Sequence, residues 1–95
     1  MSTTESLFNS IREGNSAKVA DILSADSSLL EVRDTRGSTP LILATYYNQI
    51  EISKILLEKG TDLNSKDSSG NTALMGVCFK GYIDIARLLI DNGAD

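Results

Sequence analysis

The feature that most restricts how this chain can fold is an internal repeat with a period of about 33 residues. When residues 34–62 are aligned with residues 67–95, nine of the 29 paired positions are identical. The identical pairs are Asp34/Asp67, Gly37/Gly70, Thr39/Thr72, Leu41/Leu74, Ile50/Ile83, Ile52/Ile85, Leu56/Leu89, Gly60/Gly93 and Asp62/Asp95. They are turn residues, helix-start residues and apolar residues at helical spacing. A period of this length predicts a stack of small units, in which each unit buries its Leu and Ile face against its neighbour.

The second unit contains the local signals of two short helices. Thr39 followed by Pro40 predicts a helix start, because the hydroxyl accepts a free backbone N–H and proline is tolerated at the first helical position. This helix is expected to run to about Tyr47 and to end at Asn48, a residue that tolerates the left-handed conformation. A second helix with one apolar face is expected to stop at the glycine that opens residues 60–70. These residues are rich in turn formers and predict a tight β-turn or hairpin loop.

A weaker copy of the unit precedes these two. At an offset of 34 residues, Leu7 aligns with Leu41 and Gly14 aligns with Asn48. This copy lacks the Gly-x-Thr-Pro-Leu start, as an atypical terminal repeat would. The chain is therefore expected to form a single domain, 1–95, of three units, with an atypical first unit over about 1–33, a full unit over 34–66, and a truncated third unit over 67–95. The predicted fold class is an all-α repeat solenoid of stacked helix-turn-helix units joined by β-turn or hairpin loops.

The composition argues against catalysis. The chain has one cysteine, Cys78, and no histidine, so it offers neither an internal disulfide nor the usual general base. Cys78 aligns with Thr45 and is expected to be a small core residue rather than a nucleophile. The sequence predicts no enzyme, no metal site and no cofactor. A net charge of −4 argues against binding to nucleic acid through clustered Lys and Arg. There is no apolar run of the roughly 18–20 residues that a membrane span needs, and a cytoplasmic location is expected.

Several motifs in the second and third units resemble the ankyrin repeat, a unit of about 33 residues made of a hairpin and a helix-turn-helix. The motifs are Asp34-x-x-Gly37-x-Thr39-Pro40-Leu41, Ile55-Leu56-Leu57, Gly60-x-Asp62-x-Asn64, Thr72-Ala73-Leu74 and Gly93-Ala94-Asp95. The resemblance covers nearly the whole chain. The histidine that usually follows Thr-Pro-Leu in the family is Ile42 here, and Met75 in the third unit. The hydrogen bonding of that histidine between neighbouring repeats is therefore absent.

The resemblance implies a non-catalytic protein–protein interaction module that binds its partner through a concave face of turn tips and first-helix ends. By residue match, the partner-binding set is Arg12, Glu13, Arg36, Ser38, Tyr46, Tyr47, Ser69, Asn71, Phe79 and Lys80. Exposed aromatic residues beside arginine are typical of interface hot spots. This set has three basic residues against one acid, which favours an acidic or phosphorylated partner segment. The alternative for Tyr46 or Phe79 is that the ring only covers the helix layer.

A second hypothesis is that the chain is the N-terminal scaffold segment of a longer ankyrin array or multidomain protein, whose working surface lies beyond Asp95. The third unit lacks the polar substitutions that a terminal capping repeat normally carries on its outer face. Its exposed face, expected around Met75, Val77 and Leu88, is therefore predicted to self-associate or to continue into a missing repeat.

Overall fold

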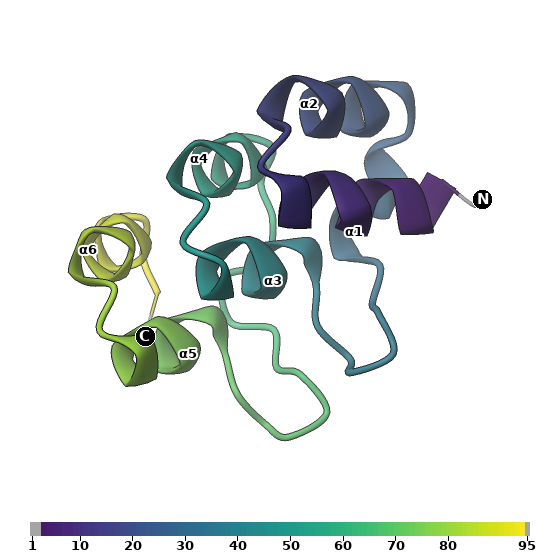
Figure 1. Ribbon diagram of the computed structural model, residues 1–95. Coiled ribbons are helices and arrows are strands. Elements are labelled where there is room, and N and C mark those ends of the chain that lie inside the picture. The colour runs from purple at the N-terminus through teal and green to yellow at the C-terminus, as the bar shows by residue number, and fades with distance from the viewer. Residues whose placement is uncertain (1–2, 95) are drawn as a thin grey trace.

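The structure, a computed structural model, describes residues 3–94 and consists of three stacked pairs of α-helices. The pairs are α1 (Thr3–Glu13) with α2 (Ser16–Ala25), α3 (Pro40–Tyr46) with α4 (Ile50–Glu58), and α5 (Ala73–Lys80) with α6 (Ile83–Asp91). A 3-10 helix, η1 (Ser27–Glu31), follows α2 and had no counterpart in the sequence-based expectations. Figure 1 shows the pairs side by side, with the two long loops before α3 and α5 projecting from the same side of the stack. The predicted all-α repeat solenoid is confirmed.

The helix boundaries follow from the capping residues that the sequence indicates. The hydroxyl of Thr39 accepts a hydrogen bond from the backbone N–H of Ile42 at 3.3 Å, and the hydroxyl of Thr72 accepts one from Met75 at the same distance. Each cap thereby satisfies one of the free N–H groups of its helix. At the other end of α3, Asn48 has a φ of 57°, the left-handed conformation that allows the chain to turn into α4.

The loops between units are tight turns held by a repeated aspartate. The N–H of Gly37 donates to the carbonyl of Asp34 at 3.0 Å, and Oδ1 of Asp34 accepts the backbone N–H groups of Arg36 and Ser38, both at 2.9 Å. Asp67 repeats this arrangement one unit later, because its Oδ1 accepts the N–H groups of Ser69 and Asn71, again at 2.9 Å. The predicted β-turns are present, and residues 3–94 contain no strand.

One apolar core runs through all three helix pairs. Its most deeply buried large residues are Leu7, Ile11, Leu23, Leu41, Ile52, Leu56, Ile85 and Leu89, each less than 2% exposed. The two short helices α3 and α5 approach closely at Gly76, where an added Cβ would lie 3.6 Å from the ring of Tyr46. The stack therefore buries its Leu and Ile residues between neighbouring pairs, without a separate globular core.

One sequence prediction about the third unit is wrong, and a second holds only in part. Cys78 was expected in the core, but its side chain is exposed, whereas the aligned Thr45 is only 1% exposed. The physical reason is the position of each helix in the stack: within the described residues, α3, which carries Thr45, packs between α1 and α5, whereas α5, which carries Cys78, has a neighbouring unit only on the side of α3. The exposed face was expected around Met75, Val77 and Leu88. Met75 is 51% exposed, but Val77 is fully buried and Leu88 is half-buried.

Candidate functional site

A groove of about 680 Å³ lies between the turn tips and the first helices of the repeats. Its walls come from the end of α1, from α3, and from the turns at residues 34–38 and 67–71. Seven of the ten residues predicted to bind a partner line it: Arg12, Arg36, Ser38, Tyr46, Tyr47, Ser69 and Asn71. The structure thus brings together side chains from all three units, from Arg12 in the first to Asn71 in the third.

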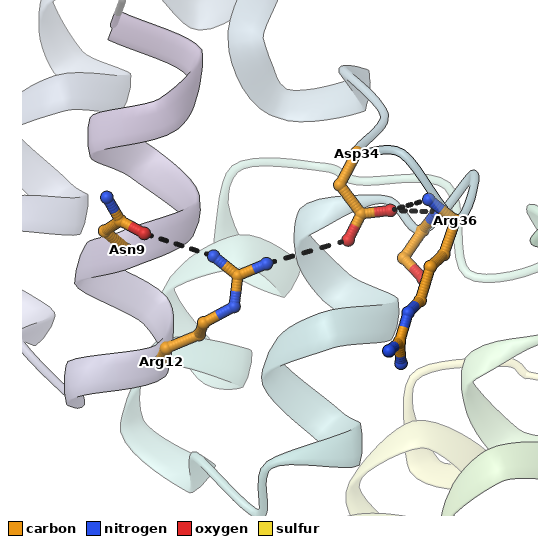
Figure 2. A network of polar contacts seen from close by, with 5 residues as sticks. Asn9, Arg12, Asp34 and Arg36 are labelled. Atoms are coloured by element: carbon orange, nitrogen blue, oxygen red, sulfur yellow. Dashed lines mark hydrogen bonds and ion pairs between the residues drawn. The ribbon is translucent and has the colours of Figure 1, made fainter. Parts of the chain in front are cut away.

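A polar network at one side of the groove fixes the first turn to α1 (Figure 2). Nη2 of Arg12 lies 4.0 Å from Oδ2 of Asp34, and Nη1 of Arg12 donates to Oδ1 of Asn9 at 3.2 Å. The side chain of Asp34 is only 10% exposed and also holds the turn through its other oxygen. Figure 2 shows the guanidinium of Arg36 pointing away from this network. Within residues 3–94, that guanidinium makes no hydrogen bond or ion pair, so it is available to a ligand.

Two adjacent tyrosines form the aromatic side of the groove. Tyr46 and Tyr47 are 43% and 46% exposed, and their ring centroids lie 6.4 Å apart with a tilt of 56°. The ammonium of Lys80 lies 4.9 Å from the centroid of the Tyr46 ring, within the range of a cation–π interaction. Tyr46 therefore does cover part of the neighbouring helix layer, as the alternative expected. More than two fifths of its surface nevertheless faces the groove and the solvent.

The structure separates three of the predicted residues from the groove. Glu13 is exposed but does not line it, and Lys80 stands at its edge over Tyr46. Phe79 is 87% exposed and lies outside the groove lining, so the ring does not cover the helix layer either. Ser38 does line the groove, although only 8% of it is exposed.

The groove also contains residues that the sequence analysis did not assign to it. Asp34 and Asp67 line it, and Ile42 and Leu43 are part of the lining while both are 8% exposed. The two acids offset Arg12 and Arg36, so the lining has no formal excess of positive charge, unlike the residue set predicted from sequence. The sequence did contain a signal for the two groove aspartates, because an aspartate recurs at the same position in the second and third units.

Among residues 3–94, no group of three His, Cys, Asp or Glu side chains could hold a metal ion. Cys78 has no histidine to activate it, because the chain contains none. No helix in the described part of the chain is long and apolar enough to cross a membrane.

Comparison with known proteins agrees with the repeat architecture. The family model for ankyrin repeats matches residues 7–95 with three copies, and the chain belongs to this family. Ankyrin repeats are generally protein–protein interaction modules and are typically non-catalytic. A search of curated proteins found no match.

Proposed function

We propose that this chain is a non-catalytic module that binds a segment of another protein in the groove between its turn tips and α3. The observation that carries the proposal is the position of Tyr46 and Tyr47, which are nearly half exposed on one wall of a groove of about 680 Å³. Exposed tyrosines combine a large contact area with a polar group, and such residues dominate interface energetics. Ile42 and Leu43 add an apolar part to the same lining.

A rigid groove wall supports this function. The N–H of Ser68 donates to the carbonyl of Arg36 at 3.2 Å, which joins the two turn tips. Nη1 of Arg33 donates to the carbonyls of Gly37 and Lys66, at 2.6 and 2.5 Å, and so links the loops of neighbouring units. Because these turns are already fixed, little conformational freedom is lost when a partner binds.

The groove lining is formally neutral, and support for an acidic or phosphorylated partner comes from Arg36. Arg12 is paired with Asp34, and Oδ1 of each groove aspartate already accepts two backbone N–H groups. The guanidinium of Arg36 has no such partner in the described residues and presents a planar set of donors that matches a carboxylate or phosphate. In this proposal, an anionic group of the partner pairs with Arg36 while apolar groups contact the tyrosines.

The test compares a groove variant with a matched variant outside the groove. A partner is first captured by crosslinking and identified, and its affinity for the purified chain is then measured by calorimetry. Tyr46→Ala/Tyr47→Ala is expected to weaken binding by about thirtyfold, equivalent to about 2 kcal/mol. Phe79→Ala removes an aromatic ring that is even more exposed but lies outside the groove lining, and it is expected to leave the affinity unchanged.

The result that sinks the assignment is equal binding by the wild-type chain and the double variant, with both folded by circular dichroism. The anionic part of the proposal is tested separately with Arg36→Gln against Arg87→Gln, an exposed arginine on α6. Only Arg36→Gln is expected to weaken binding and to reduce its dependence on salt.

A further inference from the structure

The groove is lined by four charged side chains, of which two pair with each other. Arg12 and Asp34 form an ion pair, with Nη2 and Oδ2 4.0 Å apart (Figure 2). Arg36 and Asp67, one charge of each sign, have no ion-pair partner in the described part of the chain. The proposed function already uses Arg36 for an anionic group of the partner. The carboxylate of Asp67 is thus a second unpaired charge that the groove offers to a ligand.

Asp34 and Asp67 occupy the same position in consecutive turns and hold their turns in the same way. In both, Oδ1 accepts two backbone N–H groups at 2.9 Å. The two residues differ in the other carboxylate oxygen. Oδ2 of Asp34 faces the guanidinium of Arg12, whereas Oδ2 of Asp67 has neither a hydrogen bond nor an ion pair within residues 3–94. The first turn therefore shows how a guanidinium is bound at this repeat position, and the second turn presents the same oxygen without one.

One residue of the preceding helix accounts for this difference. Arg12 lies two residues before Gly14, which has a φ of 76° and ends α1. Tyr46 lies two residues before Asn48, which has a φ of 57° and follows α3. Tyr46 thus stands in the second unit where Arg12 stands in the first, and its ring supplies no positive charge to the next turn. Tyr46 and Asp67 line the groove together.

The ring of Tyr46 also favours a positive charge beside it. The ammonium of Lys80 lies 4.9 Å from the centroid of this ring, and Lys80 forms no ion pair among the described residues, so it leaves Asp67 unpaired. A guanidinium can stack its plane on an aromatic ring while its N–H groups donate to a carboxylate, which a lysine ammonium does less well. The side chain that best suits Tyr46 and Asp67 together is therefore an arginine.

We propose that the partner segment bound in the groove carries an arginine, whose guanidinium pairs with Asp67 beside the ring of Tyr46. This inference rests on the proposed function, because it concerns the same groove and the same partner. The partner then carries both signs of charge, with an anionic group for Arg36 and an arginine for Asp67. The bond from the N–H of Ser68 to the carbonyl of Arg36 joins the two turns and so limits how far apart these charges can lie. A purely acidic segment is disfavoured, because Asp67 repels it.

The test uses a small probe, so that it does not depend on knowing the partner. N-acetyl-arginine methylamide is titrated into the isotope-labelled chain and followed by NMR, in parallel with the citrulline and lysine counterparts. Citrulline has nearly the shape of arginine but no charge. The arginine probe is expected to shift the amide signals of Ser69 and Asn71, whose N–H groups donate to Asp67. It is expected to bind about fivefold more tightly than the citrulline probe and more tightly than the lysine probe.

Matched variants locate the bound guanidinium. Asp67→Asn keeps a side-chain oxygen for the turn N–H groups, and it is expected to weaken the arginine probe about fivefold, to the level of the citrulline probe. Asp84→Asn removes the same charge from an exposed position on α6, outside the groove lining, and is expected to leave the affinity unchanged. Circular dichroism checks that both variants are folded.

Three outcomes would overturn the inference. The first is equal binding of the arginine and citrulline probes by the wild-type chain, which includes the case that Arg36 turns to neutralise Asp67. The second is equal binding of the arginine probe by the Asp67→Asn and Asp84→Asn variants. The third is a lysine probe that binds more tightly than the arginine probe.

The captured partner separates this inference from the proposed function. Suppose that Tyr46→Ala/Tyr47→Ala weakens binding of the partner and Asp67→Asn does not. The groove is then the binding site, and the assignment of an arginine to Asp67 is wrong. If neither variant weakens binding, the proposed function fails as well.

Discussion

The two ends of the stack differ in how they meet solvent. At the first end, α1 and α2 expose only polar residues and alanine, including Lys18 and Asp21. At the last end, α5 and α6 expose Met75 and Ile83 at positions where the preceding repeat is covered. Each end is one helix pair, and the two pairs expose different kinds of side chain. It teaches that an exposed isoleucine in a repeat protein is best judged against its own counterpart one repeat earlier.

The largest predicted effect comes from comparing a buried leucine in the middle of the stack with an exposed isoleucine at its last end. Leu56 is fully buried in α4, between helix pairs on both sides. Leu56→Ala is expected to cost about 2–5 kcal/mol of unfolding free energy, because it removes buried methyl groups and leaves a cavity. Ile90→Ala removes a side chain that is 55% exposed in α6 and is expected to cost less than about 0.5 kcal/mol. Urea unfolding followed by circular dichroism at low protein concentration measures both. Equal costs would contradict the view that the last end is uncovered.

The next prediction compares the same substitution at two aligned isoleucines, one in the middle unit and one in the last unit. Ile50 packs against the core, whereas the aligned Ile83 is 64% exposed. Ile50→Lys is expected to lose about 2–3 kcal/mol, since it removes apolar contact area and brings a charge towards the interface of two repeats. Ile83→Lys is expected to change the stability of the monomer by less than about 0.5 kcal/mol. If both lysines cost the same in dilute solution, then the two faces are equally covered, and the comparison of the ends fails.

Much of the fold was predictable from the sequence because its signals are local. The cap at Thr39, the left-handed residue Asn48 and the repeat period each determine short-range geometry, and the structure confirms all three. Burial at the last end was predicted less well. Cys78 was expected in the core by analogy with Thr45, but a residue of a repeat is buried only where a neighbouring pair exists to cover it.

The candidate groove was largely predictable from the repeat, and the two turn acids that were missed, Asp34 and Asp67, also share a repeat position. Seven predicted residues meet in the groove because the repeat period places turn tips and helix ends on the same side. The role of Asp34 depends on a contact with Arg12 in α1, a residue distant in sequence, which no local pattern indicates. For a related reason Phe79, which follows the motif but has no next repeat beside it in the described residues, falls outside the groove lining.

A third prediction compares an inner turn tip with the last one. Gly37 and Gly70 both have positive φ, at 75° and 84°, so alanine is strained by about 1 kcal/mol at either position. At Gly37, a Cβ would also lie 2.8 Å from the backbone nitrogen of Ser68, whereas nothing lies within 4 Å at Gly70. Gly37→Ala is therefore expected to cost about 1–2 kcal/mol more than Gly70→Ala in thermal or urea unfolding. Similar values for the two variants would show that the turn tips do not pack on one another.

The smallest effect concerns the ion pair that ties the first end to the first turn. Nη2 of Arg12 and Oδ2 of Asp34 are 4.0 Å apart, and the side chain of Arg12 is 41% exposed. Because water screens such a pair, Arg12→Gln is expected to cost no more than about 1 kcal/mol, and less at high salt. Asp34→Asn is the informative control. It removes the same ion pair, and it also removes the negative charge that strengthens the hydrogen bonds from the turn N–H groups to this side chain. Asp34→Asn is therefore expected to cost more unfolding free energy than Arg12→Gln. Urea unfolding at low and high salt separates the two contributions. A larger loss for Arg12→Gln would mean that the ion pair, rather than the turn itself, holds the groove wall against the polar end of the stack.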